Sequence, residues 1–225
     1  MVVSLIIPVL NEEKTIEGLL DNISALTGSK EVIVADGGSA DKTKELAISR
    51  AKVIDCPRGR GPQCNMGALH ADGDIFFFIH ADSRLPQDAL DKICLAVARG
   101  AQWGCLKLVF DDKHWFIRLV AWGSNLRVRL RGVVFGDQGI FMTKDLFESL
   151  GGFPALPLME DYRLSLDLKA RKTPPIQVSS YIISSARRFN TEGRLSAIWR
   201  MIRMRKLYRD GADFSTILEM YRDVR

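Results

Sequence analysis

Acidic side chains follow apolar segments of this chain, at places where they could bind a cation or accept a proton. Asp82 comes shortly after the apolar run at residues 76–79, with His80 between them. A short apolar run bounded by turn residues is typical of a strand buried on both faces of a parallel sheet. Such sheets bind ligands outside the carboxyl ends of their strands, so we expect Asp82 to face a crevice. A carboxylate there suits a divalent cation that holds phosphate oxygens; the alternative is that Asp82 only begins the next helix.

A second acidic site is the adjacent pair Glu160 and Asp161, at the predicted start of a helix. The helix dipole alone would explain two carboxylates at a helix N-terminus. An apolar, proline-containing loop at residues 153–159 leads into the pair, which favours a position at a pocket as well. An aspartate at a pocket edge can act as a general base, because it accepts a proton only in the transition state.

A third site is basic. The loop at residues 57–62 carries Arg58 and Arg60 beside Gly59 and Gly61, at the start of another predicted helix. Arginine beside free backbone N–H groups is a natural phosphate site, and the alternative is a solvated basic loop.

The elements that position these residues alternate between strands and helices. Apolar runs predict strands at residues 2–9, 31–35, 51–55, 76–79, 102–109, 140–143 and 174–184, the last at a sheet edge. Helices are predicted from a cap at Asn11, from a cap at Asp41 to Arg50, and at residues 88–99, 115–131, 144–150, 160–172 and 195–208. The first half is therefore a βαβαβ unit of a nucleotide-binding α/β sheet.

We expect a single domain over residues 1–225. It comprises a nucleotide-binding half (1–100), an acceptor half (101–190) and a basic helical tail (191–225). In residues 187–225 the basic residues outnumber the acidic ones by five, which equals the net charge of +5 for the whole chain. This balance suits an anionic ligand or a membrane surface and is too weak to indicate nucleic acid binding.

Cysteine spacing and hydropathy indicate the cellular compartment in which we expect the protein. Cys56, Cys64, Cys94 and Cys105 form no C-x-x-C pair, so we expect reduced thiols rather than a zinc site or disulfides. The chain has no run of eighteen apolar residues and no basic leader, so the expected location is the cytoplasm.

Together these motifs resemble the family-2 inverting glycosyltransferases of the GT-A fold, and within them a compact bacterial group. Residues 4–13 (SLIIPVLNEE) are similar to the opening strand and Asn-Glu pair of that family, and residues 36–41 (DGGSAD) to its second signature. Arg60 with Gly61, Asn65 and Gly67 resembles the arginine and helix that close over the donor. Glu160 and Asp161 resemble the Glu-Asp pair whose Asp is the catalytic base. One departure is His80-Ala81-Asp82 in place of Asp-x-Asp, so only the last carboxylate remains.

The resemblance implies a Rossmann-like nucleotide-diphospho-sugar transferase fold: a mixed, mainly parallel sheet flanked by helices, with C-terminal helices. It implies transfer of a sugar from a UDP- or GDP-sugar to a hydroxyl acceptor with inversion, and lipid-linked acceptors are among the candidates. Mg²⁺ or Mn²⁺ would bind at Asp82. The implied residues are Asp161 and Glu160 for catalysis; Pro8, Asn11, Glu12, Asp36, Arg60 and His80 for the nucleotide; and Asp137, Gln138 and Arg188 for acceptor or donor sugar.

Two other enzyme classes and an inactive binding protein are the alternatives to this function. A sugar nucleotidyltransferase needs a glycine-rich loop after the first strand, and an NAD-linked dehydrogenase needs G-x-G-x-x-G after a strand; neither pattern is present. A catalytically inactive nucleotide-sugar-binding protein of the same fold is favoured only by His80. The tail carries four apolar or aromatic residues along one side: Ile198, Trp199, Ile202 and Tyr208. With this side it could contact anionic lipid at the inner face of the membrane as a peripheral element. The alternative is that the tail packs on the domain and leaves a basic face in solvent.

Overall fold

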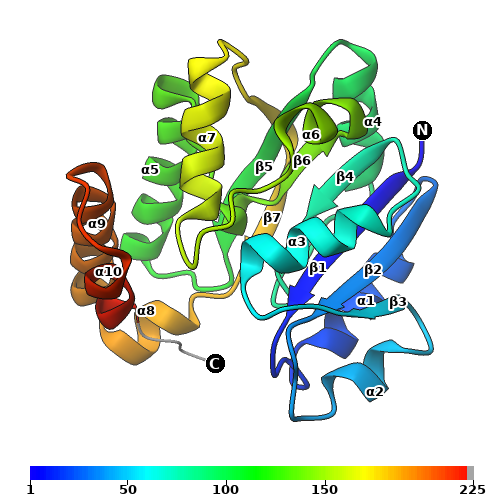
Figure 1. Ribbon diagram of the computed structural model, residues 1–225, viewed down its shortest axis with the longest axis horizontal. Helices are drawn as coiled ribbons and strands as arrows, with labels where there is room; N and C mark the ends of the chain where they lie inside the picture. Colours follow the sequence, from blue (N-terminus) through cyan, green and yellow to red (C-terminus); the bar gives the residue numbers. More distant parts are fainter. Residues whose placement is uncertain (222–225) are drawn as a thin grey trace.

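The chain folds into three layers, with helices on both faces of one seven-stranded sheet (Figure 1). The structure is a computed structural model and describes residues 1–221. Residues 222–225, the last four of the predicted basic tail, lie outside the described residues.

The sheet has the strand order β3-β2-β1-β4-β6-β5-β7. Its strands are β1 (Val3–Val9), β2 (Lys30–Asp36), β3 (Lys52–Asp55), β4 (Ile75–Phe78), β5 (Trp103–Phe110), β6 (Ile140–Thr143) and β7 (Ile176–Ser184). All neighbouring strands are parallel except that β6 runs antiparallel to β4 and β5. The mixed, mainly parallel sheet is thereby confirmed, as is the edge position of β7.

One face of the sheet is covered by α1 (Ile16–Ser24), α2 (Thr43–Ala47) and α4 (Ala89–Ala98). Side chains of a strand alternate between the two faces, so Leu5 and Phe77 pack here against Leu20 of α1 and Ile93 of α4. These four side chains are at most 2% exposed. Burial of this apolar surface stabilises the position of these helices on the sheet.

The other face is covered by α3 (Arg60–Leu69), α5 (Trp115–Arg131), α6 (Lys144–Leu150) and α7 (Glu160–Ala170). Phe76 and Phe78 of β4 point to this face and contact the ring of Phe147 on α6. Because β4 is buried on both faces, the interpretation of residues 76–79 as a central strand is confirmed. β4 therefore delivers the segment from His80 to Asp82 to the edge of the sheet.

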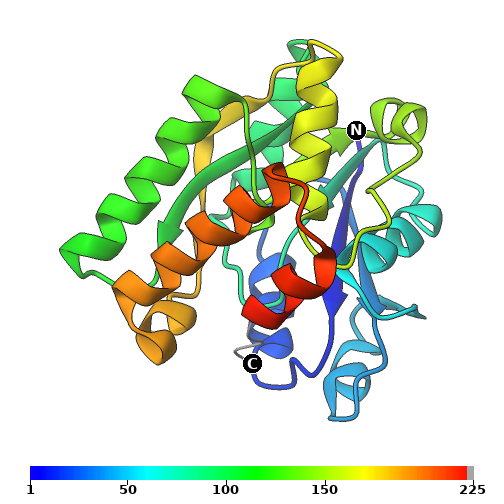
Figure 2. The same ribbon diagram turned by 60° about the vertical axis from the view of Figure 1, so that its left-hand side comes forward.

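Three C-terminal helices pack beside α5 and α7: α8 (Arg187–Glu192), α9 (Arg194–Arg209) and α10 (Phe214–Met220) (Figure 2). Of the apolar side expected either to contact lipid or to pack on the domain, Trp199 and Ile202 are 60% and 52% exposed. Ala197 and Met204 are buried instead. Ala197 joins a cluster with α5, and Met204 joins one with α7 and α10, so α9 packs on the domain through the side that carries these two residues.

Two predicted helix starts also differ. Asn11 does not cap α1, which begins at Ile16. The backbone of Asn11 is left-handed (φ 56°), and its side-chain oxygen accepts a hydrogen bond from the Ala40 N–H at 2.8 Å, so it joins the loops after β1 and β2. Asp41 accepts from the Thr43 N–H at 3.0 Å, but the helix that follows ends at Ala47 rather than at Arg50.

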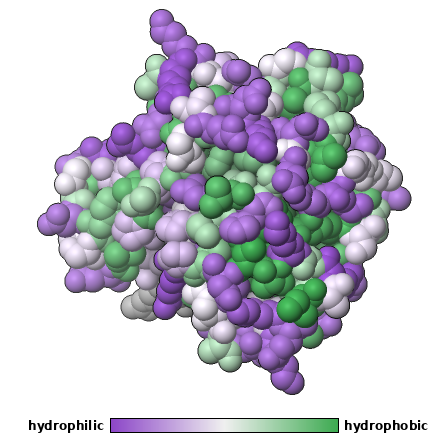
Figure 3. Space-filling view, turned by 45° about the vertical axis from the view of Figure 1, so that its right-hand side comes forward, coloured by the Kyte–Doolittle hydropathy of each residue, from purple (hydrophilic) through white to green (hydrophobic). Residues whose placement is uncertain are grey.

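Strand polarity decides which residues meet at one edge of the sheet. β1, β2, β3, β4, β5 and β7 all end there, and the antiparallel strand β6 begins there. The short 3-10 helix η1 (Gly136–Gln138), which precedes β6, therefore lies at the same edge as the segments after β1 and β4. No helix within residues 1–221 is both long and apolar enough to cross a membrane. The surface turned forward in Figure 3 is a mixture of hydrophilic and hydrophobic side chains.

Candidate functional site

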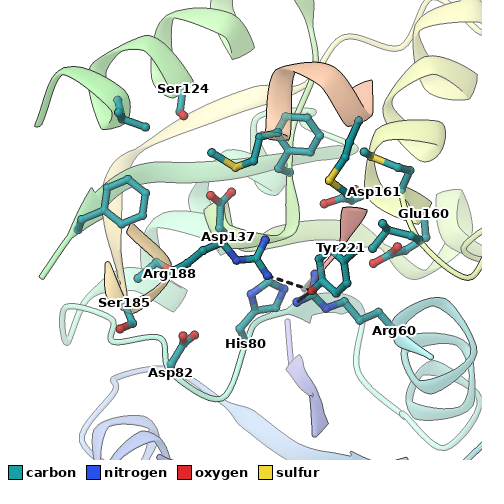
Figure 4. Close-up of a pocket in the computed structure, with 18 of the residues that line it drawn as sticks. Arg60, His80, Asp82, Ser124, Asp137, Glu160, Asp161, Ser185, Arg188 and Tyr221 are labelled. Carbon is teal, nitrogen blue, oxygen red and sulfur yellow. Dashed lines mark hydrogen bonds between the residues drawn. The ribbon is translucent and has the colours of Figure 1, made fainter. Parts of the chain in front are cut away.

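A cavity of about 630 Å³ opens at this edge of the sheet (Figure 4). Its walls come from the ends of β1, β4 and β7, from η1, from the starts of α3 and α7, and from α5 and α9. Charged side chains line the part above β1 and β4. The part beside α5 and α9 is lined mainly by apolar side chains, together with Arg127, Arg131 and Arg205. We call these parts the polar half and the apolar half.

Asp82 lies in the polar half and is paired with Arg187. The Nη2 atom of Arg187 lies 3.5 Å from Oδ2 of Asp82 and 3.5 Å from Oε1 of Glu12, so one guanidinium joins the segments after β1, β4 and β7. Burial raises the pKa of Asp82, and the nearby Arg187 opposes that rise. The carboxylate is therefore available to a cation that can compete with Arg187.

Two further arginines meet at one phenol. The guanidinium groups of Arg60 and Arg188 donate hydrogen bonds to the Tyr221 hydroxyl at 3.4 Å and 3.1 Å. The Arg188 guanidinium also lies 4.9 Å from the centre of the Tyr221 ring. Figure 4 shows these three side chains converging at the floor of the cavity near His80. The polar half thus holds a concentrated positive charge, which suits a diphosphate.

The start of α3 is shaped by its glycines. A Cβ at Gly61 would lie 2.8 Å from the carbonyl oxygen of Pro154, so only glycine lets α3 approach the loop that leads into α7. Asn65 fixes the same loop, because its side chain donates to the Phe153 carbonyl at 2.9 Å and accepts from the Phe153 N–H at 2.7 Å. Arg60 and the acidic pair at the start of α7 are held together in this way.

Three carboxylates face the cavity close to these arginines. Asp161 accepts the Gly136 N–H at 2.8 Å and the Tyr162 N–H at 2.6 Å. Burial raises the pKa of Glu160 to about 7, with a contribution from the charge of Asp161, while Arg60 opposes the rise. Burial likewise raises the pKa of Asp137 to about 6, against the effect of Arg127. Oδ1 of Asp137 is buried and has no hydrogen-bond partner among the described residues, so it can accept one from a ligand.

The apolar half is built by side chains from several elements. It is lined by Phe110, Val120, Leu126, Leu130, Phe135, Leu158, Met159, Phe189, Ile198, Met201 and Met204. α5 and α9 contribute more than half of them. Figure 4 shows Ser124 of α5 directed toward the same space.

Metal ligands are sparse at this site. Within residues 1–221 no group of three or more His, Cys, Asp or Glu side chains is arranged to hold a metal ion. Asp82 is a single carboxylate at the cavity wall. Mg²⁺ is commonly held by one or two carboxylates plus substrate phosphates, so this donor set fits a cation that arrives with a diphosphate.

Most of the predicted site residues line the cavity. These are Pro8, Glu12, Arg60, His80, Asp82, Asp137, Glu160, Asp161 and Arg188.

Asn11, Asp36 and Gln138 are not brought to the cavity wall. Asn11 binds the loop after β2. The buried carboxylate of Asp36 accepts from the N–H groups of Gly38 and Ser39, and buried Gln138 accepts from Arg127 at 2.9 Å.

Several site residues were not predicted. Arg187 stands beside Arg188 in the sequence, and that doubled arginine after a strand was the available signal. Arg127 and Tyr221 line the cavity from α5 and from the end of α10, and no local pattern marks either of them. Gln63 donates to the carbonyls of Val9 and Ala35, both at 2.7 Å, and so fixes α3 over the ends of β1 and β2.

Comparison with known proteins gives one family match and several partial relatives. The model of the family described as "Glycosyl transferase family 2" matches residues 4–141. The chain is 34% identical over 116 residues to 4,4'-diaponeurosporenoate glycosyltransferase of Staphylococcus haemolyticus, covering 47% of this chain and 31% of that protein. It is 37% identical over 92 residues to glucosyl-3-phosphoglycerate synthase of Mycobacterium tuberculosis, covering 36% and 28%. The matched regions span about a third of the length of these curated relatives.

Solved structures share the fold over most of the chain. The mannosyltransferase PcManGT from Pyrobaculum calidifontis, solved with GDP-Man and Mn²⁺, has a TM-score of 0.68 at 23% identity, covering 97% of this chain and 68% of that one. The Mycobacterium tuberculosis synthase with Mn²⁺, UDP-glucose and phosphoglyceric acid has a TM-score of 0.56 at 25% identity, covering 76% and 65%. These are GT-A glycosyltransferase structures, so the predicted fold class is confirmed.

The raised pKa of Glu160 predicts a pH-dependent stability. The folded protein retains the Glu160 proton up to a pKa of about 7 and the unfolded chain loses it near 4.5, so the folded state binds more protons between these values. Stability contributed by this group is therefore lost as the pH rises from about 5 to 7. Glu160→Gln should gain about 2 kcal/mol relative to wild type between pH 5 and pH 8 in urea unfolding. The control Glu17→Gln, at an exposed position, should show no such change. If the free energy of unfolding had the same dependence on pH in Glu160→Gln and in wild type, the raised pKa of Glu160 would be contradicted.

Proposed function

The chain belongs to glycosyl transferase family 2, and we propose that it moves a sugar from a nucleoside-diphosphate sugar to an acceptor hydroxyl with inversion at the anomeric carbon. One observation carries the proposal: a single cavity holds converging arginines and, close to them, the carboxylates of Asp161 and Asp137. A donor with its diphosphate on the arginines would place its sugar toward these carboxylates.

The polar half supports a nucleotide-sugar donor. Arg60, Arg187 and Arg188 provide the positive charge that a diphosphate requires. Pro8 and Glu12 line the cavity where the nucleoside would lie next to β1, with Asp36 just behind that wall. Structures of the same fold were solved with GDP-Man and with UDP-glucose, so either nucleotide is a candidate for this chain.

Asp161 is the proposed general base. As the acceptor oxygen attacks the anomeric carbon, its proton passes to a carboxylate oxygen of Asp161, and the bond to the diphosphate breaks with its electron pair leaving on the diphosphate. Attack on the face opposite the leaving group inverts the configuration. The N–H groups of Gly136 and Tyr162 fix the orientation of Asp161 toward the cavity. Asp137, with its unpartnered oxygen, would accept a hydrogen bond from a sugar or acceptor hydroxyl.

A divalent cation fits the polar half only together with the donor. Asp82 would hold it, and Arg187 would then keep its contact with Glu12. When bound, Mg²⁺ or Mn²⁺ would neutralise charge on the departing diphosphate. The guanidinium groups of Arg60 and Arg188 would also stabilise the negative charge on the departing diphosphate.

A binding protein without turnover is the alternative. It rests on His80, which stands where the related pattern has a carboxylate. The cavity offers no further support for it, because a protein that only binds nucleotide sugars has no need of an oriented Asp161 and a free Asp137 oxygen on the acceptor side.

A cytoplasmic location, with contact to the inner face of the membrane, is the proposed setting for the protein. The tail contributes Trp199 and several arginines, of which Arg203 lies 5.0 Å from the Trp199 ring centre. Tyr208 does not take part, because its ring packs against those of Tyr162 and Phe214. Exposed tryptophan next to basic residues suits the headgroup region of an anionic membrane.

Replacement of the base tests the mechanism. Asp161→Asn should lower kcat by about 10²- to 10⁴-fold and leave nucleotide affinity nearly unchanged, because general-base catalysis contributes a factor of that size. Rates of nucleoside diphosphate release and of labelled sugar transfer measure kcat, and NMR of the product reports the anomeric configuration. Asp167→Asn on the same helix is the matched control and should keep wild-type turnover. Normal turnover in Asp161→Asn would refute the assignment.

Calorimetric titration tests the donor and the metal. We expect one of UDP, GDP, UDP-sugars or GDP-mannose to bind in Mn²⁺ and to lose at least about tenfold in affinity in EDTA. In Asp82→Asn the affinity should be weak in both buffers, whereas Asp145→Asn, an exposed aspartate on α6, should behave as wild type. Affinity that ignores EDTA would contradict the metal at Asp82 and leave the diphosphate on the three arginines.

Sedimentation with vesicles tests the membrane contact. The protein should co-sediment with phosphatidylglycerol vesicles at low salt and much less at 0.5 M salt. At the higher salt the electrostatic screening length lies between about 3 and 8 Å, which weakens the attraction between basic side chains and the anionic membrane surface. It should not co-sediment with phosphatidylcholine vesicles. Trp199→Ser should reduce binding, and Leu69→Ser, which removes an exposed apolar residue from α3, should not. Equal sedimentation without vesicles and with anionic vesicles would exclude the contact.

A further inference from the structure

The cavity has a mainly apolar wall beside α5 and α9. Val120 and Leu126 of α5 and Ile198 and Met201 of α9 are only partly buried and face the cavity. Apolar side chains kept next to an open cavity lose the free energy that burial would supply. A ligand with an apolar body would recover that free energy by covering them.

The outer face of α5 continues this apolar surface. Trp115, Leu119, Trp122 and Leu130 are 69%, 52%, 61% and 73% exposed. Their spacing of three, four and eight residues places them on one side of the helix. Leu126 falls on the same side, and both Leu126 and Leu130 line the cavity. The exposed stripe of α5 therefore runs without interruption into the apolar half.

α9 carries a matching stripe. Leu195, Trp199 and Ile202 are 74%, 60% and 52% exposed and also share one helix side. α9 lies beside α5, joined to it by a cluster that includes Ile117 of α5 and Ala197 of α9 (Figure 2). An exposed apolar surface of this extent on two neighbouring helices marks an interaction site rather than ordinary solvent-exposed surface.

Basic side chains accompany the two stripes. Arg118 and Arg129 on α5 and Arg203, Lys206 and Arg209 on α9 are exposed. Tryptophan and leucine between arginines match the boundary between acyl chains and anionic headgroups. The end of this surface at Leu126 and Leu130 lines the same cavity as Asp137 and Asp161.

We propose that the acceptor is a lipid alcohol, with its chain in the groove between α5 and α9 and its hydroxyl at Asp161 and Asp137. This inference rests on the proposed sugar transfer and adds the class of acceptor to it. Ser124, which faces the groove from α5, lies where the chain would pass (Figure 4). A water-soluble acceptor would leave the apolar wall and both stripes without a ligand.

The test measures binding of fluorescently tagged dodecanol and, for comparison, of butanol with the same tag. Wild type should bind the dodecanol probe at least about tenfold more tightly, since each further buried CH₂ adds affinity. Ser124→Trp fills the groove and should weaken dodecanol binding at least tenfold. Met201→Asp places a charge in the opposite wall and should do the same if Ser124→Trp fails to fold. Ser149→Trp, on the exposed side of α6, is the matched control and should bind like wild type.

Nucleotide titration of the same samples separates the two proposals. Nucleotide affinity should stay at the wild-type level in the groove variants, because their substitutions lie outside the polar half. The proposal of a lipid acceptor would be overturned if wild type bound both probes equally, or if both groove variants bound dodecanol as wild type does. If nucleotide binding is retained in that case, the proposed sugar transfer still stands. Dodecanol binding without any nucleotide binding would overturn the sugar transfer and the acceptor role with it.

Discussion

The direction of the strands is the constraint on which the whole site depends. Six strands end at one edge of the sheet, and β6 alone begins there. The segments that follow β1, β4 and β7 supply Glu12, Asp82 and Arg187, and the single antiparallel strand brings η1 with Asp137 to the same place. If β6 were parallel, Asp137 would lie at the opposite edge, and Glu160 and Asp161 would face the cavity without it.

The sequence predicts those parts of the fold that depend on local pattern. The run at residues 76–79 has no polar residue, so a buried strand is the one element that satisfies it, and its end fixes Asp82 at the sheet edge. α5 and α6 have the predicted bounds because a capping side chain and a left-handed glycine mark both ends of each helix: His114 and Gly132 for α5, Thr143 and Gly151 for α6. Asn11 was wrongly predicted as a cap, because its left-handed backbone depends on the neighbouring loop after β2.

Contacts between distant segments account for what the sequence does not predict. Tyr221 meets Arg60 across 161 residues, and Arg187 meets Glu12 across 175 residues, and no local spacing encodes such pairs. The orientation of α9 has the same origin. Apolar residues stand on both its exposed and its buried side, so the packing of Met204 against α7 and α10 decides which side faces solvent. Trp199 and Ile202 are exposed as a consequence, and the surface they form with α5 is a property of the tertiary structure.

The adjacent carboxylates of α7 differ in environment, and this difference supports a division of roles. Glu160 is 6% exposed, and burial raises its pKa to about 7, so near neutral pH it carries a proton for much of the time. A neutral Glu160 spares Asp161 the repulsion of a second charge on the next residue. Asp161 faces the cavity, and two backbone N–H groups hold its carboxylate in one orientation. This difference agrees with the proposal that Asp161, rather than Glu160, takes the proton from an acceptor hydroxyl.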